Sequence, residues 1–211
     1  SASNQTGKRY LVEYSSPNTN KPLHLGHIRN NLIGHSVSEI LKASGNEVFK
    51  ANLVNDRGIH ICKSMLAWVE DGMETSPGTE NLKGDHFIGK YYVKFEQQFK
   101  KEVDGLVKKG LNEDEARQVA PSMKKAKEML VNWEKGEPEI LEIWKKLNQW
   151  AYEGFDETYD RMGIGFDKTY HESETYLLGK ETVLEGLKNG VFYKKGDGSV
   201  WCPLKDEGLD D

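Results

Sequence analysis

The sequence has almost no cysteine and no long apolar run, and each shortage excludes a class of protein. Only 2 cysteines, Cys62 and Cys202, occur among 211 residues, which is too few for a disulfide framework or a four-cysteine zinc site. No stretch approaches the roughly 18 consecutive apolar residues that a membrane helix needs. We therefore expect a soluble protein of the reducing cytoplasm that has no membrane partner and no metal site of its own.

The sequence also lacks an excess of basic residues. It carries 29 Lys+Arg against 34 Asp+Glu, a formal net charge of -5, which argues against a surface that is basic throughout and leaves room only for a local basic patch. Hydrophobic residues make up 36% of the chain and aromatic residues 10%, enough to build a packed core. The length suits one domain with an insertion, or two small domains.

The first part of the chain has the pattern of a strand, a loop, a helix and a second strand. Residues 8–14 alternate polar and apolar side chains, as a strand does. Residues 27–43 repeat apolar side chains at three- and four-residue spacings and are followed by Gly45, which predicts a helix and its end. Residues 47–54 have strand character again. This order predicts a right-handed βαβ unit with parallel strands.

The rest of the chain changes pattern twice. Residues 71–85 are rich in Gly, Thr, Ser and Pro and predict a loop, and the region from 87 to 162 is helix-prone and carries most of the Trp and Lys. A strand at 166–171 and a hairpin that joins 191–193 to 199–201 are predicted near the end. Helices are predicted at residues 59–69, 87–109, 112–135, 137–162 and 178–188.

These patterns predict an α/β protein with a helical insertion. Residues 1–7 are polar and are expected to be a cloning remnant or a linker, and the chain stops directly after a strand-like, aromatic-rich segment. We therefore expect a fragment of a longer protein. Its predicted divisions are the first part of a catalytic core at 8–86, a helical insertion at 87–162, and a shortened return to the core at 163–211.

The loop between the first strand and the first helix gathers groups that bind phosphate. Lys21, His24 and His27 surround Gly26 at a predicted helix N-terminus, where backbone N–H groups favour anions. The glycine lets a flat ring approach the backbone closely. Imidazole N–H groups and an ammonium can offset the charge that spreads over phosphoryl oxygens during attack on an α-phosphorus. The segment therefore predicts a polyphosphate site that acts by electrostatic stabilisation.

This segment resembles the HIGH signature of class I aminoacyl-tRNA synthetases in its arginyl-tRNA synthetase form, through Pro17, Asn18, Lys21, His24, Leu25, Gly26 and His27. The segments 13–18 and 51–58 also look like that family's pattern, as do Ile28-Arg29, Ile33-Gly34 and Glu172-Ser173. Two positions depart from it: Asn30-Asn31 stand where many members have Ser-Thr, and Arg57 stands where many have Trp. The resemblance covers residues 8–211, but only the first half of the family's catalytic core.

The resemblance implies a fold and a set of residue roles. The fold would be the first half of a Rossmann-like parallel sheet of the HUP type, with a long helical insertion and a C-terminal β-hairpin. His24, Gly26 and His27 would hold ATP, with both histidines acting in catalysis. Lys21 would bind phosphate and take over part of the work of an incomplete KMSKS loop. The residues implied to bind arginine are Glu13, Ser16, Asn18 and Glu172.

The resemblance also implies a function for the full-length protein, which would be an arginine–tRNA ligase. It would use ATP with its Mg²⁺ to activate L-arginine and pass it to tRNA(Arg), as a monomer in the cytoplasm, while the fragment itself would be inactive. Two other functions remain open from the residues: a small nucleotidyltransferase that shares the HxGH loop, and a non-catalytic ATP-binding module. The long insertion and the lead-in at 13–18 argue against the nucleotidyltransferase.

Several conspicuous residues also have structural explanations. His60 and Cys62 are two apart, but no second ligand pair follows them, so helix packing is favoured over zinc. Glu13 could be a solvent-facing carboxylate, and Glu172 could cap a helix. Asp56 and Gly58 could line the pocket or make a turn. Solvated helix faces are expected for the lysine pairs at 100–101, 108–109, 124–125 and 145–146, and core positions for Trp133, Trp144 and Trp150.

Overall fold

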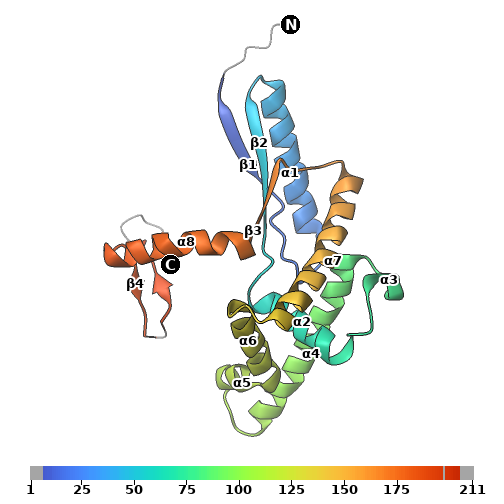
Figure 1. Ribbon diagram of the computed structural model, residues 1–211, viewed down its shortest axis with the longest axis vertical. Coiled ribbons are helices and arrows are strands. Elements are labelled where there is room, and N and C mark those ends of the chain that lie inside the picture. The colour runs from blue at the N-terminus through green and yellow to red at the C-terminus, as the bar shows by residue number, and fades with distance from the viewer. Residues whose placement is uncertain (1–6, 197, 205–211) are drawn as a thin grey trace. The chain divides into compact units, whose positions relative to one another are not determined.

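The computed structural model describes residues 7–196 and 198–204 (Figure 1), and the chain divides between Tyr170 and His171 into two compact units. Within the described ranges, none of the helices combines the length and the apolar character needed to span a membrane. The elements in chain order are β1 (Arg9–Glu13), α1 (Leu25–Ala43), β2 (Glu47–Val54), α2 (Ile59–Asp71), α3 (Pro77–Glu80), α4 (Gly84–Lys108), α5 (Glu113–Val119), α6 (Pro121–Glu134), α7 (Pro138–Met162), β3 (Lys168–His171), α8 (Glu172–Lys188), β4 (Tyr193–Lys194) and β5 (Val200–Trp201).

The predicted βαβ unit is present at the start of the first unit. Strands β1 and β2 pair in parallel, with Tyr10 opposite Val48, and α1 connects them and lies alongside both (Figure 1). Strand β3 follows in the order β1-β2-β3, and its approach is marked by the Asp167 N–H, which donates to the Lys50 carbonyl at 2.9 Å. The α/β class and the parallel strand pair are therefore confirmed.

The second unit contains α8 and the predicted hairpin. Strands β4 and β5 pair antiparallel, with Tyr193 opposite Trp201, so the hairpin is confirmed for its strands. Residue 197 of its turn, like residues 1–6 and 205–211, lies outside the described residues. Helix α8 begins at Glu172, six residues before the predicted start at 178, and two acidic residues lie in its first turn, where they favour a helix N-terminus.

Two predictions, one for a helix and one for a loop, are wrong because of local sequence features. The helix predicted at 112–135 is split into α5 and α6, because Ala120 has an extended backbone (φ -53, ψ 132) immediately before Pro121, and the residue before a proline is disfavoured in the helical region. The loop predicted at 71–85 contains the short helix α3. A capping box between Ser76 and Thr79 starts that helix.

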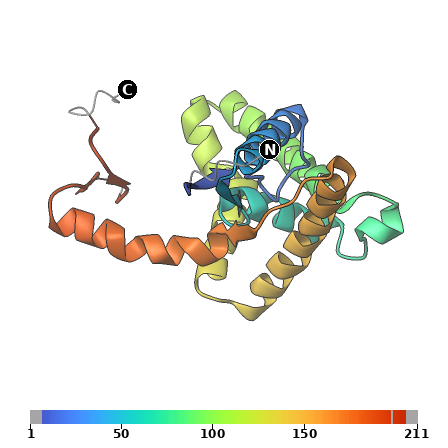
Figure 2. The same ribbon diagram turned by 90° about the horizontal axis from the view of Figure 1, so that it is seen from above.

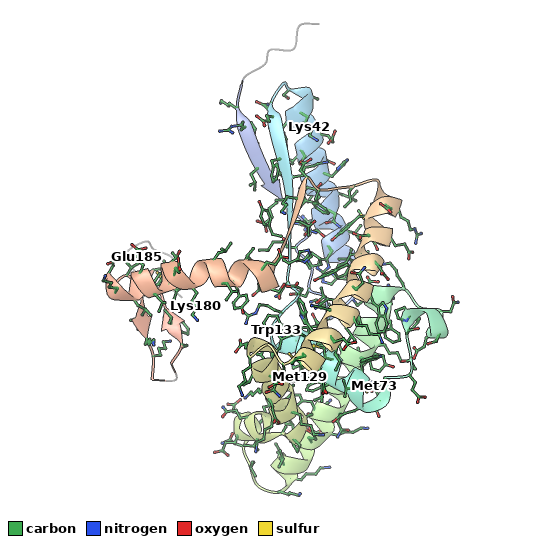
Figure 3. The ribbon with its side chains drawn as sticks, in the orientation of Figure 1. Lys42, Met73, Met129, Trp133, Lys180 and Glu185 are labelled. Carbon is green, nitrogen blue, oxygen red and sulfur yellow. The ribbon has the colours of Figure 1, made fainter. Side chains whose placement is uncertain are left out.

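The core of the first unit lies among the helices rather than against the sheet. Its buried residues come from α2 and from α4 to α7, with Tyr14 and Val54 extending it to the strands. Helix α6 contributes Met129 and Trp133, which Figure 3 labels, and both are buried. Because α2 shares this core with the helices after residue 84, the helical segment has no separate core. The division at 8–86, 87–162 and 163–211 remains our proposal.

Candidate active site

The loop that carries the phosphate-binding motif leaves the carboxyl end of β1, beside the end of β2. The Thr19 N–H donates to the Asn55 carbonyl at 3.0 Å, and the Asn55 N–H donates to the Pro17 carbonyl at 2.9 Å. Asn18 and Asn55 form an isolated parallel bridge there. In open α/β sheets, ligands bind outside the carboxyl ends of the parallel strands, so this loop lies where a ligand is expected.

The turn at the start of the loop is strained and is held from three elements. Ser15 (φ 77) and Ser16 (φ 46) both have a left-handed backbone, which is unusual for residues other than glycine. The Ser15 N–H donates to Asn30 Oδ1 of α1 at 2.6 Å, and the Ser16 N–H donates to Asn52 Oδ1 of β2 at 3.0 Å. The Ser15 hydroxyl contacts the Tyr159 hydroxyl of α7 at 2.7 Å. These contacts hold the strained turn in place.

Sequence reasoning did not identify Asn30, Asn52 and Tyr159 as supports of this turn. Asn30 was visible as a departure from the family's pattern, and Asn52 lies inside a segment that matches it. The signal that Asn30 and Asn52 share is a side-chain amide whose oxygen can accept a backbone N–H. Which backbone each amide reaches depends on packing between distant segments, and Tyr159 is separated from Ser15 by 144 residues.

His24 and His27 form a pair at the start of α1. His24 is the N-cap, and its Nδ1 accepts the Gly26 N–H at 3.1 Å, while Nδ1 of His27 accepts the His24 N–H at 3.2 Å. The two ring centroids are 4.0 Å apart. A ring nitrogen that accepts an N–H carries no proton, so each neutral imidazole carries its proton on Nε2. Both Nε2–H groups remain as donors.

Gly26 leaves the space that the His24 ring occupies. A Cβ on Gly26 would stand 2.9 Å from Cε1 and 3.0 Å from Nδ1 of His24. The sequence predicts that this glycine lets a flat ring approach the backbone, and the ring found there is the imidazole of His24. The glycine therefore permits the capping geometry that directs the His24 Nε2–H group.

Burial and nearby charge disfavour the charged form of His27. Burial lowers the pKa of His27 below its ordinary value of 6.5, and the nearby His24 and Lys21 lower it further. Lys21 is half-buried and lines a hollow of about 600 Å³ together with His86 and Tyr92 of α4. The structure thus brings Lys21, His24 and His27 together in one electropositive stretch of loop and helix start.

The residues implied to bind arginine fall in different places. The Ser16 hydroxyl donates to Glu13 Oε1 at 3.0 Å, so this pair is in contact at the end of β1. Asn18 is half-buried in the same loop. Glu172 is the first residue of α8 in the second unit, and within the part of the chain that the structure describes no side-chain hydrogen bond caps the start of that helix. Glu13 is exposed.

Asp56, just after β2, is anchored to α7. It is buried, and its Oδ2 accepts the Tyr152 hydroxyl at 2.8 Å. Its backbone carbonyl accepts Trp144 Nε1–H at 2.6 Å and Asn148 Nδ2–H at 3.2 Å. These contacts tie the end of β2 to the helical segment, and they support the structural explanation of Asp56.

Arg57 and Gly58 shape the following turn. The Arg57 guanidinium donates to Glu134 Oε1 at 2.9 Å and lies 5.5 Å from the centroid of the Trp133 ring. Arg57, which stands where many members of the family have Trp, is therefore packed against an aromatic ring of α6. Gly58 has a φ of 95°, a backbone conformation that residues with a side chain rarely adopt, and this supports its turn-making role.

His60 and Cys62 take part in helix packing. The His60 Nδ1 lies 3.2 Å from the Tyr92 hydroxyl. Cys62 is buried, and that burial, with Glu134 nearby, raises the pKa of its thiol to about 12, so it is an inert thiol. Among residues 7–196 and 198–204, no group of three or more His, Cys, Asp or Glu side chains is arranged to hold a metal ion.

Comparison with known proteins adds a family to this geometry. Residues 1–208 match the family described as "tRNA synthetases class I (R), catalytic domain". The chain is 58% identical over 200 residues to the arginine–tRNA ligase of Bacteroides fragilis, covering 95% of the chain and 34% of the relative. It is 56% identical over 203 residues to that of Flavobacterium psychrophilum, with 96% and 34% covered. The chain thus spans about a third of the length of these curated relatives.

Solved structures agree with this fold. The Thermus thermophilus arginyl-tRNA synthetase aligns with a TM-score of 0.63 and 26% identity, covering 90% of this chain and 29% of that one. The Plasmodium falciparum arginyl-tRNA synthetase aligns with a TM-score of 0.60 and 21% identity, covering 95% and 30%. The second likeness concerns the fold alone.

Proposed function

The chain belongs to the family of class I tRNA synthetase catalytic domains for arginine, and on that premise we propose that its full-length protein is an arginine–tRNA ligase. In the first step, a carboxylate oxygen of arginine bonds to the α-phosphorus of ATP, and the bond to pyrophosphate breaks. In the second, a hydroxyl of the terminal adenosine of tRNA(Arg) takes the arginyl group, and AMP leaves. Both steps place extra charge on oxygens that the protein must stabilise.

The observation that carries this proposal is the pair of Nε2–H donors at the start of α1. Because the Nδ1 atoms of His24 and His27 already accept backbone N–H groups, each ring presents one defined donor. Donors that are fixed before the reaction need no reorientation as charge develops on the phosphoryl oxygens. We assign His24, His27 and Lys21 to catalysis and ATP binding, with Gly26 giving the His24 ring its place.

ATP and its Mg²⁺ are treated together in this proposal. The loop offers a helix N-terminus, two imidazole N–H donors and an ammonium, and this set of groups attracts an anion rather than a metal ion. Mg²⁺ therefore enters as the complex with the phosphates of ATP. Lys21, His24 and His27 hold the phosphate oxygens that the metal ion leaves uncoordinated.

Arginine is proposed to bind on the β1 side of the same loop. Ser16 and Asn18 bind its α-amino and α-carboxylate groups. Glu13 orients the Ser16 hydroxyl through their contact at 3.0 Å. A guanidinium pairs most tightly with a carboxylate when two parallel hydrogen bonds form, which makes Glu13 and Glu172 the acidic groups for recognition of the substrate.

The remaining parts of the proposal concern the full-length protein as a whole. We propose that tRNA(Arg) is its nucleic-acid partner and that it acts as a monomer in the cytoplasm. Size-exclusion chromatography with light scattering measures the mass of the full-length protein. A mass of two or more chains at working concentration contradicts the monomer.

The central test is arginine-dependent exchange between ATP and pyrophosphate by the full-length protein, with tRNA(Arg) present. His24→Ala and His27→Ala should each lower kcat about 10²–10³-fold with little change in the KM for arginine, because their donors act chiefly in the transition state. His35→Ala is the matched control, since His35 lies about two turns further along α1. A rise in the KM for arginine with an unchanged kcat contradicts the assignment. Nucleotidyl transfer to an acceptor other than an amino acid would favour a nucleotidyltransferase.

A further inference from the structure

The two residues between Lys21 and His24 are held by the first turns of α4. The Leu23 N–H donates to Asp85 Oδ2 at 3.4 Å. The Pro22 ring lies against α4 at Gly89, where an added Cβ would stand 2.7 Å from Pro22 Cδ. Two consecutive loop residues are therefore fixed by one helix that is distant in the sequence.

Asp85 is a charged group in a fully buried position. Its side chain is 0% exposed and forms an ion pair with Lys83 at 3.0 Å, while its Oδ1 accepts the His86 N–H at 3.0 Å. Lys83 also donates to the Thr158 hydroxyl of α7 at 2.6 Å. A buried carboxylate is costly unless it is paired and hydrogen-bonded. These contacts fix the orientation of the carboxylate that receives the Leu23 N–H.

The start of α4 has no room to retreat from the loop. A Cβ on Gly154 of α7 would stand 2.5 Å from the Asp85 backbone nitrogen, and a Cβ on Gly84 would stand 1.8 Å from the Trp150 carbonyl oxygen. The two helices are in contact along this stretch because glycine leaves the space. Because this contact between α4 and α7 is close-packed, α4 cannot shift to accommodate a displacement of the loop.

We propose that Asp85 is a positioning residue for adenylate formation, and that Lys83, Asp85 and Gly89, which we call the α4 clasp, set the spacing between Lys21 and His24. The clasp acts through Pro22 and Leu23. The inference rests on the proposed function, because Lys21 and His24 must reach one triphosphate at the same time. Misplacement of catalytic groups by about 1 Å can cost as much as 10²-fold in rate.

The first test changes the loop contact without weakening the helix. In the full-length protein, Gly89→Ala should lower kcat for arginine-dependent exchange by about tenfold or more, because the new Cβ displaces Pro22 and with it the groups on either side. The KM for arginine should stay within about twofold, since uniform substrate binding is left intact. Gly105→Ala is the matched control: Gly105 lies on the same helix, and a Cβ added there meets no heavy atom of the described residues within 4 Å, apart from its chain neighbours and the backbone of its own helix. Alanine favours a helix over glycine, so a weakened helix cannot explain the loss.

The second test removes the charge. Asp85→Asn should lower kcat in the same way, and its effect should shrink in a Lys21→Ala background, because two changes that act through one contact are not additive. Glu102→Gln is the matched control, since Glu102 of α4 accepts the Ser122 N–H at 2.9 Å and the Ser122 hydroxyl at 2.6 Å at a distance from the loop. An equal loss of kcat in Asp85→Asn and Glu102→Gln assigns Asp85 a structural role only.

A readout that needs no turnover separates this inference from the proposed function. Lys21 and His24 both influence the pKa of His27, so an NMR titration of His27 should shift in Gly89→Ala and stay unchanged in Gly105→Ala. If the wild type shows no exchange, the proposed function fails, and the α4 clasp is then tested by the His27 titration alone. An unchanged His27 titration in Gly89→Ala overturns the clasp. Equal loss of exchange in both glycine variants overturns it as well.

Discussion

At the scale of single residues, helix capping and the proposed catalysis depend on the same hydrogen bonds. The Nδ1 atoms of His24 and His27 accept backbone N–H groups that the start of α1 would otherwise leave unpaired. A side-chain cap stabilises a helix by about 0.5–2 kcal/mol. The contacts that define the two Nε2–H donors therefore also hold the first turn of the helix, so the donors have a fixed direction before the proposed binding of ATP.

Lys21 is where the proposed mechanism can be tested most directly. If its ammonium offsets charge on the phosphates, Lys21→Ala in the full-length protein should slow adenylate formation about 10²–10³-fold. Lys21→Arg should restore only part of the rate, because a planar guanidinium replaces a compact charge. Single-turnover measurement of adenylate formation decides the case. An unchanged rate in Lys21→Ala would remove this residue from the mechanism.

The titration of His27 provides a second residue-scale prediction. Lys21→Met should raise the pKa of His27, because the lysine charge is one of the causes that lower it, but the value should stay below 6.5 because burial is the largest cause. The unfolded chain takes up this proton more readily than the folded one, so His27 disfavours folding as the pH falls below 6.5. NMR titration measures the pKa. A fall in the pKa in Lys21→Met would contradict the charge effect.

At the scale of elements, α1 packs on the strands through its small and polar residues. Asn31, Gly34 and Ser38 are buried, and no hydrogen-bond partner of the Asn31 side chain lies among the described residues. Most of its large apolar residues are exposed instead: Leu25, Leu32, Ile33, Val37 and Ile40. The close approach of α1 to β1 depends on Gly34, because a Cβ there would stand 2.4 Å from Tyr14 Cγ.

Gly34→Ala should therefore destabilise the fold by about 1–3 kcal/mol, the usual cost of overpacking a close contact. The Tyr14 ring cannot move aside easily, because it is buried and its hydroxyl donates to the Gly165 carbonyl at 2.8 Å. Urea unfolding of the two proteins measures the difference in free energy. Gly105→Ala, in an open part of α4, serves as the control and should not destabilise. Equal stability of Gly34→Ala and the wild type would contradict this prediction, because it would show that the Tyr14 ring moves aside.

At the scale of the whole molecule, the buried core and the proposed catalytic residues lie in different parts of the first unit. Most buried apolar side chains belong to α2 and to α4–α7, where the rings of Trp68 and Phe87 both pack edge-on against Trp150. Figure 1 shows the loop with the motif running between β1 and the start of α1, on the side of the bundle where the strands lie, and Figure 2 gives the same arrangement seen from above. The α4 clasp connects the helical bundle to the loop. The helical segment therefore holds the loop in place, although Lys21, His24 and His27 come from the loop and from α1.

The 211-residue chain alone is predicted to show no arginine-dependent exchange between ATP and pyrophosphate. It spans 34% of its relative from Bacteroides fragilis, and the ligand crevice of such sheets is lined from both halves of the fold. His24, His27 and Lys21 then face ATP from one side, and substrate orientation is lost. The assay compares the chain with the full-length protein under the same conditions. Measurable exchange by the chain alone would contradict this prediction.

The sequence alone determined what depends on neighbouring residues and chemical type. The strand–helix–strand order, the end of β2 at Val54 and the gathering of Lys21, His24 and His27 at a helix start all follow from local periodicity and composition. The break between α5 and α6 was also local, since it follows from the proline at 121.

Only the tertiary structure decided how that loop is held. The partners of the Ser15 and Ser16 backbone N–H groups, the packing of Pro22 on Gly89 and the bond from Leu23 to Asp85 join residues of different elements that no local pattern links. The buried face of α1 was likewise decided by packing, because most of the apolar residues whose spacing predicts this helix are exposed in the structure, namely Leu32, Ile33, Val37 and Ile40. Periodicity reports which residues share a face, whereas the partner of that face depends on contacts that no single stretch of sequence contains.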